Sequence, residues 1–184
     1  MKLFLASTNE HKLRELQAAL PAWEIALLDA PGEPVEDGET FLDNARIKVR
    51  HGRAYAPADA WVAGEDSGIE VVALGGLPGI DSARWAADGV THLLSELGDS
   101  AERGARYVCE LVVSTPAGEE LRVTGMLEGD IADAPRGSAG FGYDPIFVPL
   151  GASSTVAELG DAWKAEHSHR AQAARALSRL LAER

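Results

Sequence analysis

The stretch from Gly64 to Trp85 reads GEDSGIEVVALGGLPGIDSARW, and it follows the apolar run Ala60–Ala63, which predicts a β-strand. Two adjacent acids, Glu65 and Asp66, precede a Ser-Gly dipeptide that favours a bend. We therefore expect the strand to end at the acids and to place two carboxylates at an exposed rim, where proteins hold hard cations. This rim is the predicted active site. The alternative is an ordinary hairpin with two solvated acids.

The residues after the acids predict a second strand and a loop. Ile69–Val72 is apolar and predicts a short returning strand. Leu74–Gly79 reads LGGLPG, which is too rich in glycine and proline for a helix. A loop of small residues between rigid strands suits the close approach of a polyphosphate.

Length and composition predict one domain over residues 1–184, because a chain with 46% hydrophobic residues can bury a full core. Twenty-nine acidic and 17 basic residues give a formal net charge of −12, which argues against binding along a nucleic-acid backbone. Cys109 is the only cysteine, so no intramolecular disulfide forms, and we expect its thiol to be buried. The apolar N-terminal segment is too short for a signal peptide or a membrane span, which predicts a cytoplasmic protein.

The N-terminal part predicts a site for an anion. Lys2–Ala6 is a plausible strand, and Ser7–Asn9 offers N-cap residues for a helix that contains Lys12. The first turn of a helix disfavours a cation, so Lys12 there indicates a negative ligand. The alternative is a solvated lysine. The chain has no GxxxxGK[ST] motif at this place, which excludes a Walker-type phosphate loop.

A second acidic segment precedes the next predicted helix. Trp23–Leu28 predicts a strand, and Thr40 caps a helix that we expect to run to about Tyr55. Glu36 lies just before this helix and is a candidate third oxygen ligand beside the two acids of the rim. Asn44, one turn into the helix, is a candidate contact for substrate or water.

The remaining chain predicts a helix, three strands and a C-terminal helix. We expect these elements at Asp88–Leu97, Arg106–Ser114, Glu120–Glu128, Ile146–Val148 and Ala171–Leu181. Glycines around Phe141 predict a loop that lays an aromatic ring against a flat ligand such as a base; the alternative is a ring packed in the core. His169 and Arg170 begin the last helix, and Ser168 can cap it. The two side chains favour an anionic or carbonyl-bearing ligand. The alternative is that both are plain surface residues.

Six segments of the chain, taken together and in this order, resemble the Ham1 family of inosine and xanthosine triphosphate pyrophosphatases. They are Ser7–Lys12, Glu36–Ala45, Glu65–Gly68, Leu74–Gly79, Gly140–Pro145 and Ser168–Arg170. The resemblance covers nearly the whole chain, and six motifs in one order are far more specific than any single one.

The resemblance implies an α/β fold that is elongated and two-lobed around a long mixed sheet, with a nucleotide cleft between the lobes. It implies a metal-dependent hydrolase that converts the non-canonical purine nucleotides ITP, dITP and XTP into the nucleoside monophosphate and pyrophosphate. The implied cofactor is Mg²⁺, one or more ions per subunit, with Mn²⁺ as a possible substitute. The implied assembly is a homodimer that takes a small-molecule nucleotide and neither nucleic acid nor membrane.

The resemblance also implies a role for each matching residue. Lys12 neutralises the triphosphate, and Asp66 is the general base. The implied metal ligands are Glu36, Glu65 and Asp66. The implied substrate contacts are Ser7, Thr8, Asn9, Glu10, His11, Lys12, Ser67, Phe141, Gly142, Tyr143, Asp144, Lys164, His169 and Arg170.

Two departures and two rival functions accompany this resemblance. Glu65 replaces an aspartate common in bacterial members, and Ala171 stands where many relatives carry glycine. A Maf-like pyrophosphatase with another base preference is disfavoured, because the chain lacks a Ser-x-Arg-Arg signature after the first strand. A nucleotide sensor without catalysis is disfavoured, because binding alone needs no base beside the acidic ligands.

Overall fold

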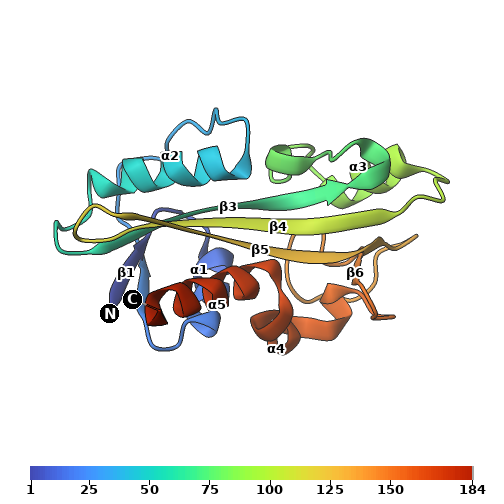
Figure 1. Cartoon of the computed structure of the whole chain (residues 1–184). Helices are drawn as coiled ribbons and strands as arrows, with labels where there is room; N and C mark the ends of the chain where they lie inside the picture. Colours follow the sequence, from blue (N-terminus) through green and yellow to red (C-terminus); the bar gives the residue numbers. More distant parts are fainter. Residues whose placement is uncertain (184) are drawn as a thin grey trace. The chain divides into compact units, whose positions relative to one another are not determined.

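The computed structural model describes residues 1–183, and its strands form one mixed sheet in the order β2-β1-β3-β4-β5-β6 (Figure 1). β1 pairs in parallel with β2 and β3, whereas β5 and β6 pair antiparallel. The predicted mixed α/β fold is therefore confirmed. The elements are β1 Lys2–Leu5, α1 Glu10–Ala19, β2 Glu24–Leu27, α2 Phe41–Arg53, β3 Trp61–Val71, α3 Gly89–Leu97, β4 Gly104–Ser114, β5 Glu120–Ile131, β6 Phe147–Pro149, α4 Val156–His167 and α5 His169–Ala182.

The chain divides into two compact units, and each is assembled from separated segments. The first unit contains Met1–Asp66, Cys109–Gly125 and the chain from Arg170 onward. The second contains Ser67–Val108 and Met126–His169. Strands β3, β4 and β5 therefore each contribute residues to both units. The expectation that residues 1–184 form a single domain stays a prediction.

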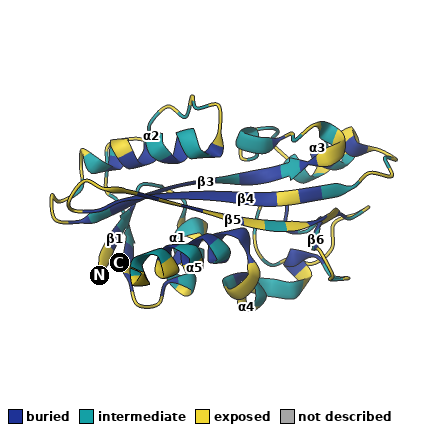
Figure 2. Cartoon of the chain, in the orientation of Figure 1, coloured by how far each residue is buried: buried dark blue, intermediate teal, exposed yellow. Residues whose placement is uncertain are grey.

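In the first unit, helices cover both faces of the sheet: α2 lies on one face, and α1 and α5 lie on the other (Figure 1). β4 contributes side chains to the packing on both faces of the sheet, because successive side chains of a strand point to opposite faces. Leu111 packs with Leu16 of α1 and Leu177 of α5, while the next residue, Val112, packs with Val49 of α2. Figure 2 shows that β3 and β4 are buried along most of their length.

The second unit has its own hydrophobic cluster. Leu93 of α3 and Val156 of α4 belong to it, together with Tyr107 of β4 and Phe147 of β6. The 3₁₀ turns Val72–Leu74 and Gly79–Asp81 occupy parts of the glycine-rich segment, where the sequence predicts a loop. Tyr143, from the glycine-flanked loop around Phe141, also belongs to this cluster.

The predicted exposed rim is wrong. β3 continues through Glu65 and Asp66 to Val71 as one strand, and both acids are buried in its interior. The Ser67-Gly68 dipeptide does not bend, because it lies within β3, beyond the residues that pair with β1 and in a strand that neighbours β4 in the sheet. The separate strand predicted at Ile69–Val72 is the second half of the same strand.

Two predicted helix caps are confirmed, and Asp88 caps a third helix for which no cap was predicted, whereas one whole helix was missed. The side chains of Asn9, Thr40 and Asp88 accept hydrogen bonds from the first turns of α1, α2 and α3. Helix α4 has no predicted counterpart, although Thr155 and Glu158 form a reciprocal capping box at its start. A non-helical glycine inside α4, Gly160 at φ +81°, interrupts the local pattern that predicts a helix.

Candidate active site

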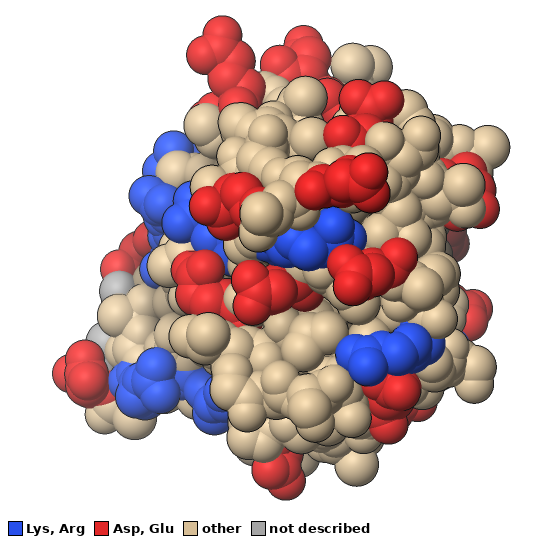
Figure 3. All heavy atoms as spheres, turned by 90° about the vertical axis from the view of Figure 1, so that its right-hand side faces the viewer, with Lys and Arg blue, Asp and Glu red and all other residues tan. Residues whose placement is uncertain are grey.

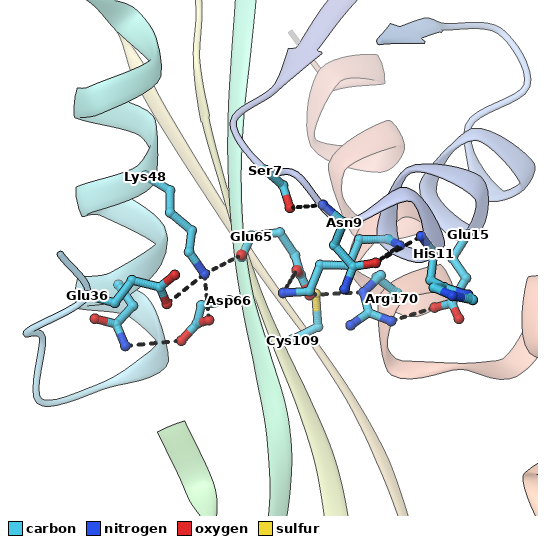
Figure 4. Close-up of polar contacts among 12 residues, drawn as sticks. Ser7, Asn9, His11, Glu15, Glu36, Lys48, Glu65, Asp66, Cys109 and Arg170 are labelled. Atoms are coloured by element: carbon cyan, nitrogen blue, oxygen red, sulfur yellow. Dashed lines mark hydrogen bonds and ion pairs between the residues drawn. The ribbon is translucent and has the colours of Figure 1, made fainter. Parts of the chain in front are cut away.

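A fully buried carboxylate lies at the centre of the charged residues of the first unit. Glu65 is 0% exposed; its Oε2 lies 2.7 Å from Lys12 Nζ, and its Oε1 accepts a hydrogen bond of 3.0 Å from Arg170 Nε (Figure 4). The thiol of Cys109 lies 3.4 Å from the same Oε1, which confirms that this cysteine is buried. Glu65 thus joins β3 to α1 and α5 through charge.

The charges within this cluster keep Glu65 and Arg170 ionised. Burial by itself raises the pKa of Glu65, but Arg170 and Lys12 together hold that pKa well below its usual range. Burial lowers the pKa of Arg170, but the negative charges of Glu65 and Glu15 have the larger effect, so that pKa is raised. Arg170 Nη1 contacts Glu15 Oε2 at 2.5 Å, so the guanidinium lies between two carboxylates. Burial followed by the charge of Glu65 raises the pKa of Cys109, which keeps its thiol protonated and unreactive.

A second charged cluster surrounds Lys48 of α2. Lys48 Nζ lies 2.8 Å from Asp66 Oδ1 and 2.9 Å from Glu36 Oε2, and it also donates to the backbone oxygen of Glu65 at 3.2 Å. Asn44 Nδ2 donates to the other oxygen of Asp66 at 3.2 Å, and Asn44 Oδ1 accepts from the N–H of Gly38. Two carboxylates from different segments therefore converge on one cation (Figure 4).

Asp66 is a carboxylate that can take up a proton more readily than an exposed aspartate. Burial raises its pKa above the usual value, although Lys48 and Lys12 act in the opposite direction. Burial lowers the pKa of Lys48, and its interactions with Asp66 and Glu36 outweigh burial and raise it. Lys48 consequently remains a cation beside Asp66, and the pair combines a base with a compensating charge.

Glu65 and Asp66 lie on opposite faces of β3, because neighbouring side chains of a strand alternate. Asp66 faces α2 together with Glu36, whereas Glu65 faces α1 and α5 (Figure 4). Within residues 1–183 there is no group of three or more His, Cys, Asp or Glu side chains placed to hold a metal ion. Glu36 and Asp66 do present oxygens to a shared cationic atom, and hard oxygen donors of this kind suit Mg²⁺. The metal role that the resemblance implies for Glu65 is untested, and we leave Glu65 out of the proposed ligands because its carboxylate pairs with Lys12 and Arg170.

The turn between β1 and α1, where the sequence predicts an anion site, contains the expected helix cap. Asn9 Oδ1 accepts from the N–H groups of His11 and Lys12, and Ser7 Oγ accepts from the N–H of Asn9 at 3.1 Å. The Lys12 side chain extends from the start of α1 toward the buried Glu65, and 15% of this side chain is exposed. The other predicted contacts have surface partners: Thr8 donates to Glu33, and Glu10 and His11 both lie beside Arg14.

In the second unit, Asp144 gathers the residues of the predicted base-binding loop. Its Oδ2 lies 2.7 Å from Lys164 Nζ and accepts from the backbone N–H of Phe141 at 2.8 Å. Lys164 Nζ lies 4.5 Å from the centroid of the Phe141 ring. Gly142 has φ +62°, a conformation that favours glycine, and this lets the loop turn between Phe141 and Asp144.

Other predicted contacts of the second unit have structural partners. Tyr143 belongs to the hydrophobic cluster and donates to the backbone oxygen of Ser82 at 3.0 Å. His169 is 5% exposed and stacks on Tyr107, so it is not the plain surface residue of the alternative interpretation. Ser67 is half-buried on β3.

Sequence reasoning missed Lys48, Glu15 and Tyr107 as members of these clusters. One signal was present for Lys48, which lies seven residues after Phe41 on the apolar stripe of α2, where a lysine needs a buried partner. Glu15 is three residues after Lys12 and shares its helix face. Tyr107 sits in an apolar strand and gives no such signal.

Surface charge is mixed, and the positive groups are local. On the face in Figure 3, acidic side chains surround small groups of basic ones. The net charge of −12 agrees with this distribution. This face therefore offers separate basic groups and no broad positive field. No helix within residues 1–183 is both long and apolar enough to cross a membrane.

Comparison with known sequences gives one consistent family. A family model described as the Ham1 family matches residues 3–180. A dITP/XTP pyrophosphatase of Bdellovibrio bacteriovorus is 42% identical over 190 residues, which cover 96% of this chain and 95% of the relative. A dITP/XTP pyrophosphatase of Opitutus terrae is 46% identical, with 94% of this chain and 95% of the relative covered.

Solved structures agree with these matches. The Staphylococcus aureus Ham1 protein is similar with a TM-score of 0.86 at 34% identity, and 100% of this chain and 99% of that chain are covered. A nucleoside-triphosphatase and dITP/XTP pyrophosphatase of Mycobacterium abscessus gives a TM-score of 0.74 at 41% identity, with 98% and 97% covered.

The buried carboxylate predicts a stability effect. Glu65→Gln removes the counter-charge of Lys12 and leaves Arg170 with Glu15 as its carboxylate partner, and we expect the free energy of unfolding to fall by about 3–5 kcal/mol at neutral pH. The folded-state pKa of Glu65 is lowered from 4.5, so this contribution is present above about pH 4.5 and disappears as the pH falls through the lower folded value. Urea unfolding of both proteins across this pH range measures the difference.

The matched control is Glu120→Gln, because Glu120 forms an ion pair with Arg46 at the surface. Its effect on the free energy of unfolding should not exceed about 1 kcal/mol. Equal stabilities of Glu65→Gln and the wild type at neutral pH would contradict the structural role of Glu65.

Proposed function

The chain belongs to the Ham1 family, and on that premise we propose that it hydrolyses ITP, dITP and XTP to the nucleoside monophosphate and pyrophosphate. The observation that carries the proposal is the convergence of Asp66 and Glu36 on Lys48, one strand residue away from the buried pair of Glu65 and Lys12. Such a site combines a carboxylate base with cations that attract phosphate. The relatives named dITP/XTP pyrophosphatase support the substrate class.

Asp66 is the proposed general base. Water attacks the α-phosphorus, its proton passes to an Asp66 oxygen, and the bond between the α-phosphorus and the bridging oxygen to the β-phosphorus breaks. Pyrophosphate leaves with the bridging oxygen. Lys48 and Asn44 hold the Asp66 carboxylate through its two oxygens, which fixes its direction relative to α2.

Charge neutralisation is the second requirement of this reaction, because the phosphorus under attack is surrounded by anionic oxygens. Lys12 lies just inside the N-terminus of α1, where backbone N–H groups and the helix dipole also favour phosphate. We propose Glu36 and Asp66 as the protein ligands of Mg²⁺, with Mn²⁺ as a substitute. When bound, the metal ion supplies positive charge to the phosphate oxygens.

Base recognition is assigned to residues of the second unit. Phe141 offers a ring for stacking, and His169 and backbone N–H groups offer donors to the purine oxygen that distinguishes hypoxanthine and xanthine from adenine. A donor meant for this oxygen loses its partner when ATP binds, which penalises the adenine nucleotide. A direct nucleotide contact of Arg170 stays a prediction, since its guanidinium pairs with Glu65 and Glu15.

Assembly and location complete the proposal. We propose a homodimer in the cytoplasm, as the resemblance to the family implies. Sedimentation of the purified protein reports the dimer directly.

A nucleotide panel tests the proposed activity. Pyrophosphate release is measured with ITP, dITP, XTP, ATP, GTP and TTP, each with Mg²⁺ and with excess chelator. We expect release from ITP, dITP and XTP that stops in chelator, because both phosphate neutralisation and leaving-group stabilisation need the metal. Release chiefly from pyrimidine nucleotides would favour the Maf-like activity, and activity that survives chelation would overturn the metal proposal.

The role of Asp66 predicts a separation of binding from chemistry. Asp66→Asn keeps the shape of the side chain but removes the base, so we expect kcat to fall by about 10²–10⁴-fold while nucleotide still binds. Single-turnover kinetics and calorimetric titration measure the two quantities. Asp99→Asn, at an exposed position, is the control and should retain full activity. A kcat within twofold of the wild type for Asp66→Asn would remove Asp66 as the base.

A further inference from the structure

Tyr107 of β4 connects two groups of the second unit that the proposed function assigns to the purine base. Its ring lies parallel to the imidazole of His169, with a centroid distance of 4.7 Å and an interplanar angle of 9°. Tyr107 is 7% exposed and His169 is 5% exposed, so this stack is shielded from solvent. The plane of the imidazole is therefore set by the plane of the tyrosine ring.

The hydroxyl of Tyr107 reaches the second group. It donates to Asp144 Oδ1 at 3.3 Å, while the other oxygen of Asp144 accepts from Lys164 Nζ and from the backbone N–H of Phe141. Asp144 is 4% exposed. Through this carboxylate, Tyr107 is linked to Lys164 and to the backbone of Phe141.

The surrounding residues leave Tyr107 little freedom. The Phe147 ring packs against it at a centroid distance of 4.6 Å and an angle of 48°, and Phe147 is fully buried. On the loop side, a Cβ added to Gly140 would lie 2.1 Å from Asp144 Oδ2. Only glycine at position 140 therefore lets the loop backbone approach the Asp144 carboxylate this closely. The backbone of β4 and Phe147 thus give Tyr107 one fixed position.

We propose that Tyr107 is a positioning residue for base selectivity: its ring orients the donor of His169, and its hydroxyl anchors Asp144 and the loop residue Phe141. The inference rests on the proposed function, because it takes hypoxanthine and xanthine nucleotides as the ligands. A hydrogen-bond donor discriminates a purine oxygen from an amino group only if it cannot turn away from the wrong partner. Tyr107 supplies this restraint without touching the base.

Two substitutions separate the ring from the hydroxyl. Tyr107→Phe keeps the stack on His169 and removes the contact to Asp144, so we expect the KM for ITP to rise about twofold to tenfold with kcat unchanged. Tyr107→Leu also removes the stack, and we expect the ratio of kcat/KM for ITP over ATP to fall about threefold to tenfold below that of Tyr107→Phe. If Tyr107→Phe keeps a higher ITP-to-ATP ratio than Tyr107→Leu, the stacked aromatic ring is the cause of that part of the selectivity.

A spectroscopic measurement tests the stack without any substrate. The ring current of Tyr107 shifts the carbon-bound imidazole protons of His169 in the NMR spectrum, and His169→Ala identifies their signals among the five histidines. These signals should keep nearly their wild-type shifts in Tyr107→Phe and move downfield in Tyr107→Leu. Unmoved signals in Tyr107→Leu would overturn the orienting role even if the nucleotide panel had shown no activity.

The control for general destabilisation is Leu93→Ala, which removes a large buried side chain of α3 from the same hydrophobic cluster. It should lower stability and preserve the ITP-to-ATP ratio. An unchanged ratio in folded Tyr107→Leu, with a wild type that prefers ITP, would overturn the inference alone. A wild type without preference for ITP would instead overturn the proposed function. If Tyr107→Leu does not fold, Tyr107→Phe decides, and an unchanged KM there contradicts the anchor.

Discussion

The fully buried Glu65 carboxylate is the interaction on which the first unit depends. It meets Lys12 at 2.7 Å and Arg170 at 3.0 Å, so one strand and two helices share a single charge cluster. An unpaired charge in this position would be very costly, and the three residues therefore have to assemble together. Lys12 is consequently held at the start of α1, in the position that the proposed chemistry needs for a phosphate.

The alternation of side chains along β3 then divides the acids by role. Because Glu65 occupies the face toward α1 and α5, its neighbour Asp66 must face α2, where Lys48 and Glu36 meet it. Gly64 shares that face, and a Cβ there would lie 2.3 Å from a backbone oxygen of α2. This close packing keeps the helix that carries Lys48 against the strand that carries Asp66.

The sequence predicted what depends on neighbouring residues and missed what depends on distant ones. Asn9 and Thr40 are recognisable caps, because a cap is decided within one turn of helix. The end of β3 was misplaced, since adjacent acids before Ser-Gly normally indicate solvent. The buried carboxylate of Glu65 pairs with Arg170, which is 105 positions away, and no local sequence pattern predicts such a pair. Tyr107 was missed for the same reason, because its contacts arise only when separate segments meet.

The most direct test of the account is which acid binds the metal ion. Mn²⁺ binding is measured by electron paramagnetic resonance with a non-hydrolysable ITP analogue, for the wild type, Glu36→Gln and Glu65→Gln, under conditions where circular dichroism shows each protein folded. We expect Glu36→Gln to weaken Mn²⁺ binding and Glu65→Gln to leave it unchanged. Weakened binding in Glu65→Gln together with normal binding in Glu36→Gln would contradict the division of roles along β3.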